Sequence, residues 1–254
     1  MAIKKEEVLK ITSKGCKRVW DEMVEEYPVS IILNGQKIIT LMCTPSHLEE
    51  LAVGFLYLKK IIENTDQIEQ INIQKNESSS DIYVKVKKPK DEKKLNYFAL
   101  SEESIRFYEK KDSSVPFKTS IEQVLKNYNM TMDALFEMMQ RFSKRSDLFV
   151  NTGGVHSIGL YENGEPVLFY DDVSRYNTYN KLFGGTLIHQ INPENKMLLT
   201  TGRIPSEVMT WIVENGIKCV LSISVPTSGS VQIARKFGVT LMGFVRENRL
   251  NLYA

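Results

Sequence analysis

Strands and helices alternate through the second half of the chain, and this alternation limits the possible fold more than any other feature of the sequence. The hydrophobic pattern predicts a helix from about Tyr176, a strand over 197–200, a helix from Pro205, a strand over 219–224, a helix from Thr227 and a strand over 240–245. Helices of about a dozen residues between strands are typical of crossover units with parallel strands. We therefore expect a three-layer α/β/α domain around a mixed, largely parallel sheet.

A helical segment and a β-hairpin precede this alternation. Apolar residues at helical spacing over 121–142 predict one long or interrupted helix, in which Thr131 can cap a second segment. Asn163-Gly164 then separates two apolar runs, and Asn-Gly favours the type I′ turn of a tight hairpin. The predicted order is α-β-β-α-β-α-β-α-β, and we assign it to a domain over 119–254.

The first half of the chain, residues 1–118, is predicted to form a smaller unit. Asn34-Gly35 lies between two β-branched runs over 28–43, which predicts another hairpin with a type I′ turn. Ser46 followed by Glu49 predicts a capping box at the start of an amphipathic helix. Short strands are expected over 69–74 and 81–86. We therefore expect a β-hairpin and helix part before the α/β domain.

The charges of the chain nearly cancel, with 33 Lys and Arg residues against 31 Asp and Glu residues. This balance gives no global field for nucleic acid or for a membrane surface, so electrostatic recognition must be local. No apolar run reaches the ~20 residues of a membrane span, and the N-terminus lacks a signal-peptide pattern. Cys16, Cys43 and Cys219 lie far apart without a C-x-x-C pair or metal-ligand spacing. We expect a soluble, cytoplasmic protein with reduced cysteines and no bound metal.

Polar and basic residues follow four of the predicted strands. In such sheets, ligands bind outside the carboxyl ends of the strands, where loops lead into helix N-termini. Arginines, hydroxyl groups and free N–H groups are the donors that a phosphate or pyrophosphate requires. The candidates are, in chain order, Arg175, Asn177 and Lys181; Gly202 and Arg203; Thr227 and Ser228; and Arg246 and Arg249. These residues predict a site for a phosphorylated ligand.

Several candidates also have an ordinary structural interpretation. The Thr227-Ser228 pair can act as a helix N-cap, and Arg203 can form a surface ion pair. On the helix from 176, Asn177, Lys181 and Gly184 fall on the side opposite the apolar residues. These polar side chains are therefore expected to point away from the core, toward either water or a ligand.

Several motifs in this order resemble one protein family. The segments are EYPVSIILNGQKIITLMCTPSHLEELAVGFL, TGGVHSIGLY, DDVSRYNTYNKLFG, TTGRIPSEVM and SVPTSGSVQIARKFGVTLMGFVRENRLNLY. Together they are similar to the formate dehydrogenase accessory protein family FdhD, from Glu26 to Tyr253. The resemblance implies a cytidine-deaminase-like fold, in agreement with the predicted order of elements.

The resemblance also implies a function in the maturation of formate dehydrogenase. In the family, a cysteine of a C-x-x-C loop takes persulfide sulfur from a cysteine desulfurase and delivers it to the bis-molybdopterin guanine dinucleotide molybdenum cofactor. The stretch implied to contact this cofactor is Phe244, Val245, Arg246, Glu247, Asn248 and Arg249. GDP is the expected mimic, formate dehydrogenase and the desulfurase are the expected partners, and we expect a homodimer.

One segment and two single residues differ from what sulfur transfer or deamination requires. Residues 108–120 occupy the place of the C-x-x-C loop without a cysteine, and a serine hydroxyl cannot hold a persulfide. Tyr176 stands where the family has histidine. His156 lies where a deaminase-like fold would hold its metal ligand, but the H-x-E and P-C-x-x-C signatures of zinc deamination are absent. We therefore predict no zinc and assign no catalytic residue.

Two functions stay open at this point. One is an accessory protein that binds the cofactor and transfers sulfur to it. The other is a non-catalytic paralogue that binds the cofactor or a guanine nucleotide only. His156 is either a ligand contact or a hydrogen-bonded histidine of the pocket or core. Cys43 and Cys219 fall in predicted strands and are expected to behave as small buried hydrophobic residues.

Overall fold

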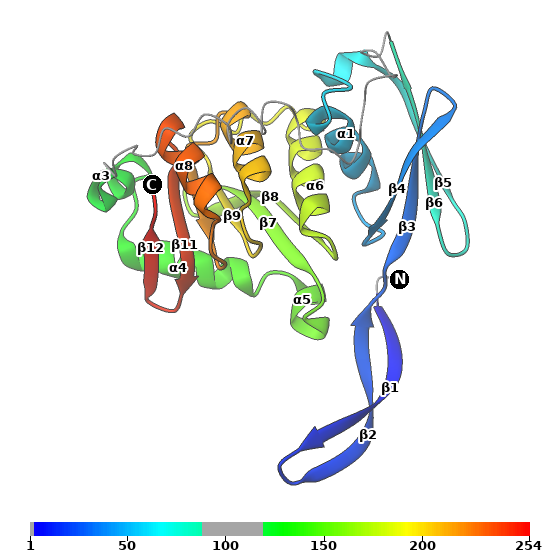
Figure 1. Cartoon of the computed structure of the whole chain (residues 1–254), viewed down its shortest axis with the longest axis horizontal. Helices are drawn as coiled ribbons and strands as arrows, with labels where there is room; N and C mark the ends of the chain where they lie inside the picture. Colours follow the sequence, from blue (N-terminus) through cyan, green and yellow to red (C-terminus); the bar gives the residue numbers. More distant parts are fainter. Residues whose placement is uncertain (1–2, 88–118) are drawn as a thin grey trace.

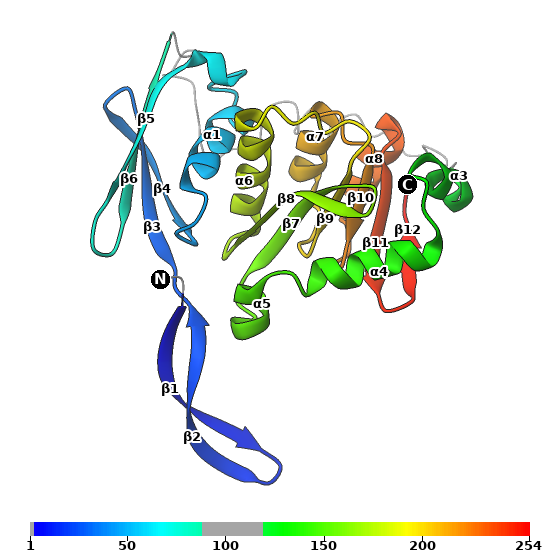
Figure 2. The same cartoon turned by 180° about the vertical axis from the view of Figure 1, so that it is seen from behind.

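The computed structural model describes residues 3–87 and 119–254. They form a projecting two-stranded arm, a small sheet with one helix, and a larger α/β unit (Figures 1 and 2). The predicted boundary between 118 and 119 falls at the edge of the described residues and stays a prediction. The segment 108–120, apart from its last two residues, lies outside the described part.

A six-stranded sheet with the order β12-β11-β10-β9-β7-β8 is the centre of the larger unit. Its strands are β7 (His156–Glu162), β8 (Glu165–Asp172), β9 (Met197–Thr200), β10 (Cys219–Ser222), β11 (Thr240–Arg246) and β12 (Arg249–Leu252). β9, β10 and β11 are parallel, whereas β7 pairs antiparallel with β8 and β9, and β12 with β11. The mixed sheet is confirmed, but its parallel part is confined to three strands because an antiparallel pairing flanks them on each side.

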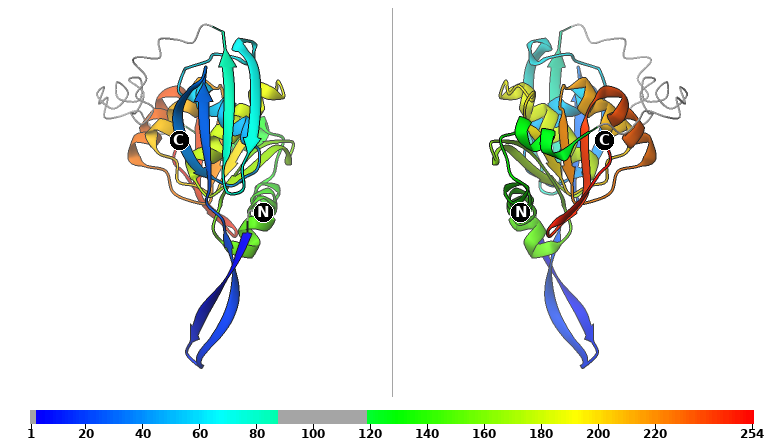
Figure 3. Two further views of the ribbon diagram at one scale, coloured as in Figure 1. Left: turned by 90° about the vertical axis from the view of Figure 1, so that its right-hand side faces the viewer. Right: turned by 90° about the vertical axis from the view of Figure 1, so that its left-hand side faces the viewer.

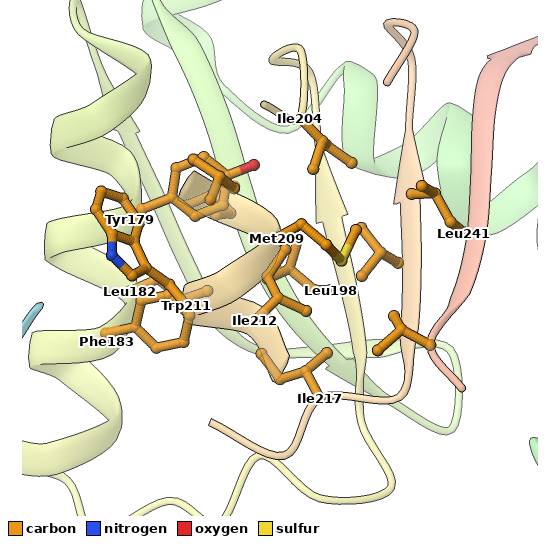
Figure 4. Packing of buried hydrophobic residues seen from close by; sticks show 14 of the residues in the cluster. Tyr179, Leu182, Phe183, Leu198, Ile204, Met209, Trp211, Ile212, Ile217 and Leu241 are labelled. Carbon is orange, nitrogen blue, oxygen red and sulfur yellow. The ribbon is translucent and has the colours of Figure 1, made fainter. Parts of the chain in front are cut away.

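Helices cover both faces of this sheet, which confirms the three layers. One face carries α6 (Arg175–Ile188), α7 (Ser206–Glu214) and α8 (Ser228–Phe237), and the other carries α3 (Ile121–Asn127) and α4 (Met132–Ser143) (Figures 1 and 2). Tyr179, Phe183 and Trp211 of the first layer pack on the sheet in a buried cluster (Figure 4). Leu135 and Phe142 of α4 belong to a separate cluster on the opposite face. Thr131 caps α4 as predicted, since its hydroxyl accepts the Ala134 N–H.

The smaller unit is a four-stranded sheet with the order β4-β3-β6-β5. It consists of β3 (Tyr27–Leu33), β4 (Gln36–Cys43), β5 (Ile68–Lys75) and β6 (Ser80–Val86), with α1 (Leu48–Leu58) on one face and a short 3-10 turn, η1 (Thr65–Gln67). Both predicted Asn-Gly hairpins are confirmed, and both residues of each turn have positive φ, as type I′ requires. The predicted capping box is wrong: α1 begins after His47, which is left-handed and makes no side-chain cap.

The two units meet where α1 crosses α6, and two glycines allow the contact. A Cβ on Gly54 would lie 1.7 Å from the carbonyl oxygen of Asn180, and one on Gly184 would lie 1.9 Å from that of Glu50. Only glycine permits this approach of two helix backbones. Helix α1 is therefore buried on both sides, between its own sheet and α6.

The arm consists of β1 (Ile3–Thr12) and β2 (Gly15–Val24), which pair antiparallel along their whole length. It projects away from both sheets (Figures 1 and 3). No strand was predicted in this segment. The described helices include none with the length and apolar character needed to cross a bilayer. Helix α5 (Asp147–Thr152), also not predicted, lies beside the base of the arm.

Candidate functional site

Hydrogen bonds join the loops that follow the parallel strands into one surface. The Ser157 N–H donates to Thr201 Oγ1 (2.9 Å), and Ser224 Oγ donates to the carbonyl oxygen of Thr201 (2.8 Å). The Phe244 N–H in turn donates to the carbonyl oxygen of Ser224 (2.9 Å). The carboxyl ends of β9, β10 and β11 are thus held together, as the parallel-strand rule predicts.

Gly202 brings three of the predicted residues together at this edge. Its N–H donates to Thr200 Oγ1 (3.1 Å), and its carbonyl oxygen accepts the Ser222 hydroxyl (2.8 Å). A Cβ at this position would lie 3.5 Å from Arg175 Cβ and 3.9 Å from His156 Nδ1. Residues from β7, α6 and the loop after β9 therefore meet at one point.

The electrostatics of this point favour an anion. Burial lowers the pKa of His156, and the positive charges of Arg175 and Arg203 lower it further, against the opposing effect of Asp172. The imidazole is therefore held neutral beside two guanidinium groups. A phosphate bound here would offset their positive charge and would make the protonated imidazole less unfavourable.

Aromatic packing, rather than a carboxylate, orients Arg175. Its guanidinium lies 4.8 Å from the centre of the Tyr176 ring, and Tyr176 makes an edge contact with Trp211 at 6.2 Å. Arg175 Nε is buried and has no hydrogen-bond partner in the described part of the chain. A buried donor of this kind is normally satisfied by water or a ligand, so the donors of Arg175 are available to one.

Two further arginines flank one aromatic ring at the β11–β12 turn. The guanidinium carbons of Arg246 and Arg249 lie 4.6 and 4.8 Å from the centre of the Phe244 ring. A register shift between Gly243 and Arg246 and a positive φ at Phe244 set this arrangement. Both arginines are exposed, and they form a second positive surface at the carboxyl end of β11.

The structure tests two ordinary interpretations, that Thr227 is a helix N-cap and that Arg203 forms a surface ion pair. Thr227 Oγ1 accepts the Ser230 N–H (3.3 Å), so the N-cap is confirmed. The Thr227 N–H donates to the carbonyl oxygen of Ile204 (3.1 Å), which places the start of α8 beside the loop after β9. Ser228 is exposed there, and a ligand contact of either hydroxyl stays a prediction. Arg203 is exposed and forms no ion pair among residues 3–87 and 119–254.

The predicted orientation of Asn177 and Lys181 is wrong, because both side chains are buried. Lys181 Nζ lies 2.7 Å from Asp172 Oδ2 and donates to Thr44 Oγ1 at the same distance. Asn177 Nδ2 donates to the carbonyl oxygen of Met42 (2.8 Å). The polar side of α6 faces the β4–α1 connection, which the periodicity of α6 alone cannot reveal. Both side chains contact Asp172, which lies opposite His156 in the β7–β8 register, so they join the two units next to this edge of the sheet.

The stretch from Phe244 to Arg249 is divided between two faces of the sheet. Val245 is buried in the cluster beneath α4. Glu247 and Asn248 line a hollow of about 500 Å³ together with Asp133 and Glu137 of α4. Three carboxylates make this hollow unsuitable for a phosphate. Among the six residues, Phe244, Arg246 and Arg249 remain as the phosphate-compatible group.

The three thiols differ in their accessibility. Cys43 and Cys219 are buried as predicted, and burial raises the pKa of each to about 12. Cys16 is exposed on the arm. The described residues contain no group of three or more His, Cys, Asp or Glu side chains suited to a metal ion.

Comparisons with known proteins agree with one another. The family model described as "FdhD/NarQ family" matches residues 24–254. The sulfur carrier protein FdhD of Bacillus pumilus (strain SAFR-032) is 32% identical over 260 residues, which cover 99% of this chain and 96% of that protein. The sulfur carrier protein FdhD of Bacillus subtilis (strain 168) is 33% identical over 241 residues, covering 93% and 89% respectively.

A solved structure shows the same fold. It is the crystal structure of a candidate formate dehydrogenase accessory protein from Desulfotalea psychrophila, with a TM-score of 0.73 and 23% sequence identity. The match covers 99% of this chain and 96% of that chain. The similarity therefore extends over both units and the arm, whereas the family model begins at residue 24.

Proposed function

This chain belongs to the FdhD/NarQ family, and we propose that it is an accessory protein for the maturation of formate dehydrogenase that binds the guanine dinucleotide end of the molybdenum cofactor. The matched residues include the whole edge formed by the ends of β9, β10 and β11. The relatives named above are sulfur carrier proteins, and we propose that the molybdenum cofactor is the group that this chain recognises.

One observation carries the proposal: four guanidinium groups lie along this edge in two pairs, one beside His156 and one beside Phe244, without a carboxylate partner in the described ranges. They belong to Arg175, Arg203, Arg246 and Arg249. Unpaired positive charges at one edge repel one another, and an anion with several phosphates offsets this repulsion. Arginine forks match phosphate oxygens in pairs, which suits a pyrophosphate linkage.

The remaining groups at the edge fit the other parts of a guanine nucleotide. The Phe244 ring, with its two arginines, offers a flat surface on which a purine base can stack. Ser228 and the start of α8 offer a hydroxyl and helix N-terminal N–H groups for a phosphate. When bound, the cofactor would supply the molybdenum centre, and these residues would hold and orient its nucleotide end.

The chain has few thiol groups that could carry sulfur. A sulfur carrier needs a thiolate, and the buried Cys43 and Cys219 thiols have pKa values near 12. Segment 108–120 contains no cysteine, which leaves Cys16 as the single exposed thiol among the three cysteines of the chain. This distribution favours a second candidate function, in which the protein binds the cofactor without carrying sulfur itself.

Calorimetric titration with GDP tests the binding proposal. We expect Arg203→Ala and Arg249→Ala each to weaken binding by about 1.5–3 kcal/mol, the value of a charge-assisted hydrogen bond. Arg141→Ala is the matched control, because Arg141 is an exposed arginine of α4 that pairs with Glu165 at 2.7 Å. Unchanged affinity in both edge variants would contradict the assignment of the site.

A labelling experiment distinguishes the two candidate functions. The protein is mixed with a cysteine desulfurase and cysteine labelled in its sulfur, and is then separated on a gel that preserves persulfides. Label that persists on the wild-type chain and disappears in Cys16→Ser would identify Cys16 as a carrier. An unlabelled chain that still binds GDP would exclude autonomous sulfur transport and leave the binding function.

A further inference from the structure

The two oxygen atoms of the buried Asp172 carboxylate bind different parts of the molecule. Oδ1 accepts the Ser174 N–H (2.9 Å) and Asn177 Nδ2 (3.0 Å), which both belong to the start of α6. Oδ2 accepts the Thr44 N–H (3.2 Å), from the connection between β4 and α1, and also pairs with Lys181 Nζ (2.7 Å). One side chain at the end of β8 therefore links the first turn of α6 to the smaller unit.

On the α6 side, this carboxylate fixes the backbone that carries Arg175. Ser174 is the N-cap of α6, and its own side chain makes no cap hydrogen bond. The hydrogen bond from the Ser174 N–H to the Asp172 carboxylate forms an Asx turn, which sets the direction in which the chain enters the helix. Arg175 is the first residue of α6 and follows this turn directly. The position of its guanidinium therefore depends on the orientation of the Asp172 carboxylate.

Asp172 also lies beside the anion site itself. It is directly opposite His156 in the β7–β8 register, and its charge raises the pKa of this histidine against the effects of Arg175 and Arg203. A carboxylate at this place repels a phosphate, so its charge opposes the binding of an anion. Any favourable effect of Asp172 on the site must therefore come from its hydrogen bonds.

A single threonine of the smaller unit orients the carboxylate from the other side. Thr44 is fully buried, and its Oγ1 lies 3.2 Å from Asp172 Oδ2 and 3.1 Å from the carbonyl oxygen of Asp171. The same oxygen accepts a hydrogen bond from Lys181 Nζ (2.7 Å). The hydroxyl is thus satisfied both as a donor and as an acceptor, and a satisfied buried network holds its members in one arrangement.

We propose that Asp172 is a positioning residue for the anion site, and that the smaller unit acts on this site through Thr44. The inference rests on the proposed binding of a phosphorylated ligand beside Arg175 and His156. The smaller unit then contributes to binding although all four arginines of the edge belong to the larger unit. Because coupling between two sites is reciprocal, a ligand that holds Arg175 in place also strengthens the contact between Thr44 and Asp172.

Calorimetric titration with GDP tests the role of the Thr44 hydroxyl. Thr44→Val, which is similar in shape and lacks the hydroxyl, should raise the Kd by about three- to tenfold, the effect of one lost hydrogen bond. Thr44→Ser keeps the hydroxyl and should stay within about twofold of the wild type. Tyr57→Phe is the matched control, because the Tyr57 hydroxyl donates to Asn215 Oδ1 (3.0 Å) and joins α1 to the end of α7. It removes another hydrogen bond between the units and should leave the Kd unchanged.

The results separate this inference from the proposed function. A wild type that binds no GDP, or one whose affinity neither Arg203→Ala nor Arg249→Ala changes, would contradict the proposed function. A wild type that binds GDP and loses affinity in Arg203→Ala, together with an unchanged Kd in Thr44→Val, would overturn the inference alone. An equal loss of affinity in Thr44→Val and Thr44→Ser would also overturn it, because the hydroxyl would then have no part in the effect.

The pKa of His156, measured by NMR in the ligand-free protein, tests the positioning of Arg175 without GDP. Thr44→Val should raise this pKa, because Arg175 would lie beside the imidazole for a smaller fraction of the time, whereas strand pairing keeps Asp172 opposite His156. Tyr57→Phe should leave the pKa unchanged. A variant that is less stable than the wild type but has the same His156 pKa would show that Thr44 has a structural role only, and the proposal would fail.

Hydrogen exchange measures the reciprocal effect of the ligand. GDP should slow the exchange of the Thr44 amide, which donates to Asp172 Oδ2, more than that of the Asn34 amide. The Asn34 N–H donates to the carbonyl oxygen of Val84 (2.9 Å) within the smaller unit and reports on the general stability of that unit. Equal slowing of the two amides would mean that GDP stabilises the whole chain without a specific coupling, and would overturn the proposal.

Discussion

Lys181 Nζ lies 2.7 Å from Asp172 Oδ2, and neither side chain has any solvent-exposed surface. The pair sits where the two units of the molecule meet. The Thr44 N–H donates to the same carboxylate oxygen (3.2 Å), and Asn177 Nδ2 donates to Asp172 Oδ1 (3.0 Å). The ion pair therefore joins the end of β8 and helix α6 to the connection between β4 and α1.

Removing one partner of this pair should destabilise the whole protein. Lys181→Met leaves the Asp172 carboxylate buried without its counter-charge, which costs about 3–5 kcal/mol in comparable pairs. Lys85→Met, which removes the exposed pair with Glu69 (2.9 Å), should leave the free energy of unfolding nearly unchanged, because solvent screens this pair. Urea unfolding of the two variants measures the difference. Similar losses in both would show that the buried pair contributes no more than a surface pair.

The Lys181–Asp172 pair is an example of an interaction that the sequence alone does not predict. The hairpins at Asn34-Gly35 and Asn163-Gly164 were predictable, because a type I′ turn depends on two adjacent residues. The burial of Lys181 was not, since its partner Thr44 is 137 positions away in the chain. Periodicity assigns one buried side to a helix, whereas α6 is covered on one side by its sheet and on the other by α1. The arm escaped prediction because most of the side chains on both its faces are exposed, which leaves no clear alternation.

The crossing of α1 and α6 predicts that alanine is tolerated less well at Gly184 than at Gly202, which lies outside this crossing. Gly184→Ala places a Cβ against the Glu50 carbonyl oxygen and should destabilise by about 1–3 kcal/mol or more through overpacking. Alanine is otherwise the better helix former by about 1 kcal/mol, so any loss must come from this contact. Gly202→Ala meets no atom closer than 3.5 Å and should change stability by less than about 1 kcal/mol. Thermal unfolding compares the two, and a stabilised Gly184→Ala would contradict the observed helix contact.

The thiols should divide into one reactive and two unreactive groups. Cys43 and Cys219, whose pKa values burial raises to about 12, stay protonated at pH 8, whereas Cys16 is exposed. We expect a thiol reagent to modify one cysteine per native chain and three after denaturation. Cys16→Ser should reduce the native count to zero. Rapid modification of a second thiol in the native protein would show that one of the two strands opens.

Part of the candidate site could be predicted from the sequence. The meeting of Thr201, Ser224 and Phe244 follows from a general property of parallel strands, whose carboxyl ends lie at one edge. The division of the β11–β12 stretch does not, because the irregularity at Phe244 decides which side chains face α4. A run of six residues that resembles a single contact segment therefore has two separate environments.

His156 reports directly on the charges at the proposed site. Burial, then Arg175 and Arg203, lower its pKa below the usual value of about 6.5. Arg203→Gln removes one of the two positive charges and should raise the pKa, and GDP bound to the wild type should raise it as well. NMR titration of the histidine ring signals measures both shifts, with Arg141→Gln as a control at a distant arginine.

The lowered pKa of His156 also gives the sign of a pH effect on stability. The unfolded chain binds this proton more readily than the folded chain, so the contribution of the neutral histidine is fully present above about pH 6.5 and is lost as the pH falls from there through the lower pKa of the folded protein. His156→Gln removes the titrating group and should flatten this part of the pH profile of the unfolding free energy. A GDP-induced decrease in the pKa of His156 would mean that the nucleotide's phosphates do not bind beside Arg175 and Arg203, and the anion site would then be limited to Arg246 and Arg249.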